Sequence, residues 1–356
     1  SRIEERSLSD RPPLSVIERE GDPEAAIAFA SLAANAPDLH AALGELLNER
    51  LVRAGFQTQL VAHGLGFELM LLAESADRAE QAARALLKAL ATPVTAADAG
   101  SAAPSKEAVR SAPSAVAACS GELEGHRRIS DPSELERERV ATFARDRSAW
   151  AVVGDDAAAS AVARALSDGP DWPELGHVRS SLPERPLTQT LRGERARLSV
   201  ALTLSNPNRA LGAAVDLAEP EGALAVRLAA LGAGLRLRHV AATAHPLGAC
   251  LRIDSDVDAS PVPDARRLGY AIQAIDDEAN LALARARDEN RLENSAVSAA
   301  DPRAAARAAA YRALVEPSAE VPAVRGISLT RPAEDPLVPS IEAAVGQART
   351  DAPPLE

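Results

Sequence analysis

The sequence predicts an α+β protein made of two similar units, each with a mostly antiparallel sheet and helices packed on one face. Two observations support this. A helix–strand–strand–helix order occurs once in each half, and the turn between the two strands reads Ala-His-x-Leu-Gly both times, at 62–66 and at 244–248. Such a recurrence is typical of an internal duplication. With 356 residues, the chain is long enough for two cores.

Composition along the chain places the boundaries of the two units. Residues 1–14 are polar and form a lead-in, 15–190 form the first unit, 191–330 form the second, and the proline-rich residues 331–356 form a tail. Within the first unit, 97–118 is rich in alanine, serine and proline and has no period. This pattern predicts a flexible segment.

In the first unit, apolar residues at steps of three and four predict an amphipathic helix over 39–51 that ends at Gly55. Ser75 opens the next helix as its N-cap. The prolines of 168–190 predict an irregular crossing to the second unit. The other predicted elements are strands at 56–63, 65–72 and 150–153 and helices at 75–90, within the charged stretch 122–147, and at 155–166.

In the second unit, the alternation of apolar and polar residues predicts strands, and alanine-rich apolar periodicity predicts helices. The predicted strands are 198–204, 236–242 and 248–253, and the predicted helices are 220–231, 264–294 and 302–314.

Charge and composition exclude several classes of protein. The net charge of -12 and the 2% of aromatic residues argue against a nucleic-acid binder, which needs a basic surface. No apolar run is long enough to span a membrane. Two cysteines, Cys119 and Cys250, are too few for a disulfide scaffold, and whether they pair stays open. The chain begins at Ser1, which we interpret as a trimmed or processed form.

Three common catalytic motifs are missing from the sequence. There is no dinucleotide-binding or phosphate-binding glycine loop and no Gly-x-Ser-x-Gly elbow. The run Asp254-x-Asp256-x-Asp258 begins like a calcium loop, but Ala259 and Ala265 stand where that loop needs glycine and glutamate. We therefore interpret this run as a solvated turn.

The duplicated unit resembles one half of the pitrilysin/insulinase-type zinc metallopeptidases, the family that includes mitochondrial processing peptidase. The resemblance lies in the order and spacing of three stretches over roughly residues 15–320. These stretches are 39–51, then 151–154 with the proline-rich crossing around Trp172, and 225–228 leading through glycines into 239–242. The resemblance implies the two-unit α+β fold.

Active members of that family carry an inverted zinc motif, His-x-x-Glu-His, in which two histidines bind zinc and the glutamate activates water. With His40 at the first ligand, Leu43 stands at the glutamate and Gly44 at the second histidine. The family also uses an arginine and a tyrosine in the second unit. With His239 at the tyrosine, Gly232 takes the place of the arginine. We therefore expect no zinc in this chain, no cofactor, and tolerance of a replacement at His40.

The resemblance then implies a non-catalytic subunit that pairs with a zinc-bearing peptidase chain, or with a second copy, and helps to form a peptide-binding chamber. A stand-alone peptide-binding or structural scaffold protein of the same fold is the alternative, and an unrecognised hydrolase is a third reading. The residues expected to face a peptide or partner are His40, Arg227 and His239. The abundance of alanine and arginine indicates a GC-rich bacterial genome, and we favour the periplasm over the cytoplasm.

Overall fold

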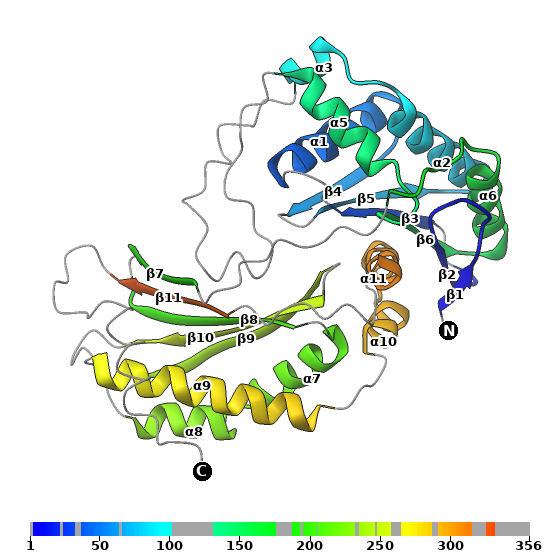
Figure 1. Ribbon diagram of the computed structural model, residues 1–356. Helices are drawn as coiled ribbons and strands as arrows, with labels where there is room; N and C mark the ends of the chain where they lie inside the picture. Colours follow the sequence, from blue (N-terminus) through cyan, green and yellow to red (C-terminus); the bar gives the residue numbers. More distant parts are fainter. Residues whose placement is uncertain are drawn as a thin grey trace. The chain divides into compact units, whose positions relative to one another are not determined.

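The computed structural model separates the chain into two compact units (Figure 1). The first unit holds the described residues up to 175 together with 291–314, and the second holds those from 187 to 286 together with 325–331. The structure describes residues 3–21, 24–32, 37–63, 66–101, 131–175, 187–192, 195–204, 206–231, 235–245, 248–257, 265–286, 291–314 and 325–331.

The first unit contains a six-stranded sheet, sheet A, in which the strand order is β1-β2-β6-β3-β5-β4. Every neighbouring pair is antiparallel except β2 and β6, which are parallel. The strands are β1 (Ile3–Arg6), β2 (Leu14–Glu18), β3 (Ala25–Leu32), β4 (Thr58–His63), β5 (Gly66–Ala73) and β6 (Ser148–Gly154).

Three helices of the first unit begin at polar N-cap residues. The side chains of Ser75, Asp131 and Asp155 each accept a backbone N–H of the first turn that follows. The helices are α1 (Pro37–Arg53), α2 (Ala76–Ala91), α3 (Ala96–Ser101), α5 (Pro132–Thr142), α6 (Asp156–Ser167), α10 (Arg291–Ser298) and α11 (Pro302–Leu314).

The two faces of sheet A bury side chains of different size. In β3, Ile27 and Phe29 pack into the core beneath α1, α2 and α6, whereas Ala26, Ala28 and Ala30 face the opposite core. That second core is closed by the alanines of α11, the orange helix in Figure 1. Because both partners present methyl groups, the helix can approach the sheet closely, and dispersion contacts stabilise the packing.

Polar contacts at the edges of this second core also hold α11 and α10 on the first unit. Arg307 of α11 forms an ion pair with Glu68, whose side chain is fully buried on β5. Arg19 donates to the backbone carbonyls of Val297 and Ala299. Arg312 bridges to Glu5 of β1. Residues 291–314, which the sequence places in the second unit, therefore complete the first.

The second unit has a five-stranded sheet, sheet B, in the order β7-β11-β8-β10-β9. Its strands are β7 (Leu187–Arg192), β8 (Arg197–Leu204), β9 (Arg236–His245), β10 (Gly248–Asp256) and β11 (Arg325–Arg331). Three helices share one apolar core with the sheet. They are α7 (Pro207–Leu217), α8 (Ala223–Ala230) and α9 (Ala265–Arg285).

The two sheets have the same topology over five strands. In sheet A the order β2-β6-β3-β5-β4 begins with a parallel pair and continues antiparallel, and β7-β11-β8-β10-β9 does the same in sheet B. The last paired residues of the two hairpins also match, because His63 pairs with Gly66 and His245 pairs with Gly248. The predicted α+β duplication is confirmed.

Some elements differ from the prediction. The sequence analysis missed strands β1, β2, β3, β7 and β11 and helix α7. The helix predicted over 264–294 ends at Arg285, and α10 is a separate helix. Most of the segment 97–118 and all of 332–356 lie outside the described residues, although 96–101 forms α3.

Candidate functional site

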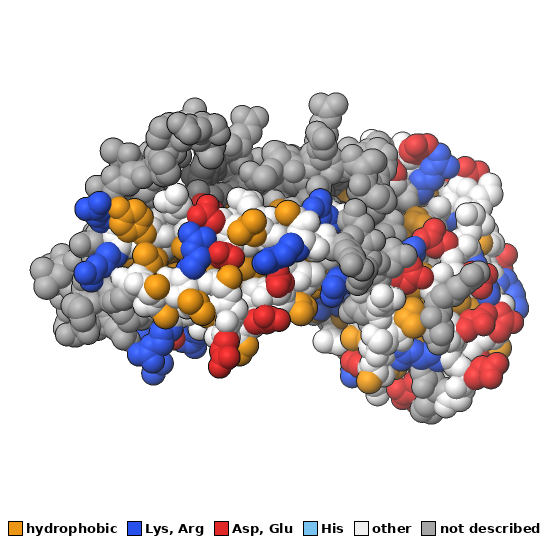
Figure 2. Space-filling model, turned by 90° about the horizontal axis from the view of Figure 1, so that it is seen from below, with side chains coloured by type: hydrophobic (Ala, Val, Ile, Leu, Met, Phe, Trp, Pro, Cys, Tyr) orange, Lys and Arg blue, Asp and Glu red, His pale blue; other side chains and the backbone are white. Residues whose placement is uncertain are grey.

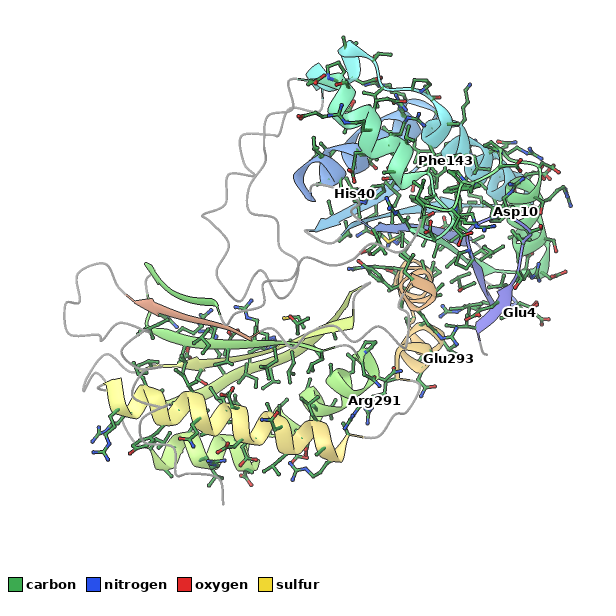
Figure 3. The ribbon with its side chains drawn as sticks, viewed as in Figure 1. Glu4, Asp10, His40, Phe143, Arg291 and Glu293 are labelled. Atoms are coloured by element: carbon green, nitrogen blue, oxygen red, sulfur yellow. The ribbon has the colours of Figure 1, made fainter. Side chains whose placement is uncertain are left out.

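A buried polar cluster links α1 to α5 in the first unit. Nδ1 of His40 lies 2.8 Å from Oε1 of Glu138 and 3.3 Å from Oγ1 of Thr142. All three side chains are buried, and the imidazole and carboxyl groups are completely so. Among the described residues, Nε2 of His40 has no hydrogen-bond partner. Figure 3 shows His40 on α1, in the same layer as α5.

The place that the resemblance gives to a metal is filled by an aromatic ring. The Phe67 ring packs against the His40 ring, with 4.7 Å between the centroids. A Cβ added at Gly44 would lie 3.0 Å from Phe67 and 3.1 Å from Leu60, so a larger side chain there would meet both. Leu43 is fully buried in the apolar core. The residues present therefore do not fit a zinc ion held by positions 40 and 44.

No set of three or more His, Cys, Asp or Glu side chains that could hold a metal ion occurs among the described residues. His40 and Glu138 supply two potential ligands, whereas a catalytic zinc site uses three protein ligands. The pair also fails as an accessible acid–base dyad, because neither group reaches solvent. Its evident role is to join two helices.

Helix α5 is held to its neighbours by further charged contacts. Arg139 donates to the carbonyl of Leu90 at the end of α2 and forms two bonds with Glu136. Glu136 in turn accepts the backbone N–H of Val94. At the end of the helix, Phe143, labelled in Figure 3, stacks on Trp172 with 4.1 Å between ring centroids. Charged groups thus pack inward where an ordinary amphipathic helix presents apolar ones.

These contacts predict a loss of stability at acid pH. The hydrogen bonds from Arg139 lower the pKa of Glu136, and the Val94 N–H adds to this, although partial burial opposes it. Because the folded pKa lies below the unfolded value of about 4.3, the ionised carboxylate stabilises the folded protein above that pH. This stabilisation is lost as the pH falls through the folded pKa. We expect the free energy of unfolding, measured with urea, to fall between about pH 5 and pH 3.

The variant Glu136→Gln isolates this effect. At neutral pH it should be less stable than the parent, and its stability should change less over the acid range. Fluorescence of Trp172 in a Trp150→Phe background reports on the end of α5. An acid dependence unchanged by Glu136→Gln would contradict the assignment.

Arg227, the second residue expected to face a partner, lies on α8 and is held by α9. Its guanidinium is 3.0 Å from Glu278 and 3.0 Å from Asp277. The hydrogen bond to Glu278 is the main reason that the pKa of Arg227 is raised. Arg227 is therefore tied to the helix layer of the second unit, where Figure 2 shows hydrophobic side chains scattered among charged ones.

His239, the third residue, is exposed on β9. Its neighbours Leu237 and Val240 pack toward the helices, so His239 belongs to the other face of sheet B. His239 and Arg227 thus stand on opposite sides of this sheet. His40 is fully buried within the first unit and does not reach solvent. The structure also shows that His40 is no surface residue, which corrects the expectation that its replacement is harmless.

The sequence analysis missed Glu138, the partner of His40. It lies 98 residues further along the chain, in a stretch where nearly every other residue is charged. Nothing in that stretch distinguishes an inward-facing glutamate from a solvated one. Only the packing of α5 on α1 makes the distinction.

Both sheets present edges at which an extended segment could add. β4 ends sheet A next to α1, and β9 ends sheet B in the described order of strands. An edge strand carries unpaired N–H and C=O groups on one side and is a template for β-strand addition.

Two further observations concern disulfide bonding and membrane-spanning helices. Cys250, on β10, is disulfide-bonded. The other cysteine of the sequence, Cys119, lies outside the described residues. No helix in the described part of the chain is long and apolar enough to cross a membrane.

Comparison with solved structures identifies the fold. The chain is similar to a peptidase M16 inactive domain from Pseudomonas fluorescens, with 13% identity, a TM-score of 0.55, and coverage of 95% of this chain and 100% of that one. It also matches the periplasmic protease PqqL from Escherichia coli, with 9% identity, a TM-score of 0.57, and coverage of 98% and 50%. Pitrilysin matches at 11% identity and a TM-score of 0.57, with coverage of 99% and 49%.

The resemblance to the pitrilysin/insulinase-type metallopeptidases is thus confirmed at the level of the fold. The chain spans about half the length of PqqL and of pitrilysin. No family model matches the sequence, and no curated protein is similar to it.

Proposed function

We propose that this chain is a non-catalytic, metallopeptidase-like subunit that pairs with a zinc-bearing peptidase chain, or with a second copy of itself, and helps to form a peptide-binding chamber. The observation that supports this most directly is the Phe67 ring beside Gly44. It occupies the space that a second metal-ligating side chain would need. The fold is that of a metallopeptidase half, and the sequence contains no His-x-x-Glu-His motif.

The proportions of the similar proteins support pairing. The chain corresponds to the whole of the inactive M16 domain and to half of PqqL and pitrilysin. The half that carries zinc would come from a partner. Among the described strands, β4 ends sheet A beside α1, and it would offer backbone hydrogen bonds to an extended peptide inside such an assembly.

The disulfide at Cys250 supports the periplasm as the compartment, because disulfides persist in oxidising environments and are rare in the cytosol. PqqL, one of the similar structures, is itself described as a periplasmic protease. A stand-alone peptide-binding or scaffold protein is the second candidate. It is favoured by β4 and β9, which end the described order of the two sheets and need no partner subunit to bind a strand.

Three measurements on the purified protein test the proposal. After dialysis, elemental analysis should find far less than stoichiometric zinc, and His40→Leu should leave that content unchanged. Light scattering should detect a complex with a zinc peptidase encoded by a neighbouring gene, and cleavage of a peptide library should rise above that of the peptidase alone. Stoichiometric retained zinc would overturn the non-catalytic assignment. A strictly monomeric chain at tens of micromolar that does not stimulate the peptidase would leave the scaffold candidate in first place.

A further inference from the structure

The face of sheet B that points away from its helices is buried. The core beneath the helices takes Leu198 and Val200 from β8 and Leu251 from β10. Side chains alternate along a strand, so the residues between these point the other way. We call this second face the rear face of sheet B. Its buried residues are Ser199, Ala201 and Thr203 of β8 and Cys250 and Asp254 of β10.

The described residues do not supply an apolar cover for the rear face. Ala201 and Thr203 have no exposed surface, and Cys250, which pairs with Thr203 in the register, is 2% exposed. Ala201 and Cys250 form an apolar cluster of their own, which no other buried apolar side chain of the described ranges joins. We therefore looked for the cover elsewhere in the chain.

A covalent bond identifies the covering segment. Cys250 is disulfide-bonded, and Cys119 is the only other cysteine of the sequence, so the bond joins these two residues. A disulfide requires the two Cα atoms to lie within about 7 Å of each other. The chain on either side of Cys119 is thereby brought to the rear face.

The sequence before Cys119 suits a close approach to this face. Residues 114–118 read Ser-Ala-Val-Ala-Ala, and small side chains on both partners allow dense packing. Sheet A has the same kind of packing, because the alanines of α11 pack on those of β3. The chain order matches as well. Helix α11 stands between α9 and β11, and Cys119 stands between α2 and β6, the corresponding elements of the first unit.

We infer that the bond between Cys119 and Cys250 holds the segment around Cys119 on the rear face of sheet B, so that the second unit is complete only in the oxidised chain. The bond closes a loop of about 130 residues, and closing so long a loop removes much conformational entropy from the unfolded chain. Two thiols lose two protons and two electrons when the bond forms. An oxidant that carries a disulfide takes them up and becomes a dithiol.

The first experiment maps the bond in the full chain and needs no peptidase, so its outcome is independent of the proposed pairing. Free thiols are blocked, and the protein is digested with trypsin without a reductant. Mass spectrometry should find peptide 111–127 linked to peptide 239–252, and a reductant should separate them. Blocked Cys250, or two copies of peptide 239–252 linked to each other, would overturn the assignment of the bond.

The second experiment tests whether the bond holds the segment in place. Reduction with a dithiol should lower the midpoint of thermal unfolding by about 10 °C, and Cys119→Ser should show the same loss without a reductant. In Cys119→Ser, a thiol reagent should modify Cys250 in the folded protein, without global unfolding. Circular dichroism verifies that this variant is folded. The midpoint of Cys119→Ser/Cys250→Ala should not respond to the reductant.

The third experiment places a charge on the rear face. In the oxidised chain, Ala201→Glu should lower the midpoint by about 5 °C or more, because the segment would bury its carboxylate. In the reduced chain the face is uncovered, so the loss should be less than half as large. The matched control is Ala229→Glu, at an exposed position of α8, which should change the midpoint by less than about 2 °C in both states.

Three results would contradict the role of the bond. A midpoint that reduction leaves unchanged would show that the bond does not stabilise the second unit. A Cys250 thiol that stays protected in folded Cys119→Ser would show that the cover remains in place without the bond. Equal losses for Ala201→Glu in the oxidised and reduced chains would lead to the same conclusion.

Discussion

Replacing Glu138 by alanine is expected to lower the free energy of unfolding by about 3 kcal/mol. The substitution removes the hydrogen-bond acceptor 2.8 Å from Nδ1 of His40 and leaves a buried imidazole with only the longer contact to Thr142. The imidazole cannot turn to water, because its side chain has no solvent exposure. Urea unfolding at neutral pH, followed by circular dichroism, measures the change.

A double substitution separates pairing from packing. His40→Leu/Glu138→Leu removes both polar partners together and should recover much of the loss, because apolar groups can replace a buried polar pair at little cost. Arg137→Ala, at an exposed position on the same helix, should change stability by less than about 0.5 kcal/mol. If Glu138→Ala were as mild as Arg137→Ala, the buried pair would not join α1 to α5.

Replacing Ala309 by aspartate is expected to cost about 4 kcal/mol and to release α11 from the first unit. Ala309 is completely buried in the core that α11 forms with the alanines of β3. An aspartate there would bury a carboxylate among methyl groups, where burial of an unpaired charge is strongly unfavourable. Thermal unfolding and binding of a hydrophobic dye would report the exposed sheet.

The same substitution at Ala304, which is exposed on the same helix, is the matched control. It adds an identical charge near the N-terminus of α11, where a carboxylate interacts favourably with the helix dipole. Its effect should stay within about 0.5 kcal/mol of the parent. Similar losses for both variants would mean that the substitutions act on helix formation, and not on docking.

The sequence revealed those elements whose signals are local. Leucines at steps of three and four on α1 predict one buried face, and Ser75 and Asp155 mark helix starts because their side chains can cap free N–H groups. The sequence pattern did not predict strand β3, because this strand is buried on both faces. Its run of small and large apolar residues shows none of the polar alternation that identifies a half-buried strand.

The surroundings of the candidate site residues depend on packing between distant segments, which no local sequence pattern predicts. His40, Arg227 and His239 were grouped through the family resemblance, yet one is sealed beneath α5, one is paired with α9, and one is exposed beside a β-bulge. A bulge depends on the register between two strands, and a buried ion pair depends on two helices far apart in sequence. Neither can be read from one segment alone.

By itself, the sequence determined the periodic helices, the two matching hairpins and thus the duplication, because each follows from residues close together in the chain. The tertiary structure decided that α11 completes the first unit, that Glu138 faces inward to His40, and that Phe67 fills the space beside Gly44. These outcomes depend on how surfaces distant in sequence fit together. An interior packed as densely as a crystal allows few such fits, and a single residue pattern does not specify which one forms.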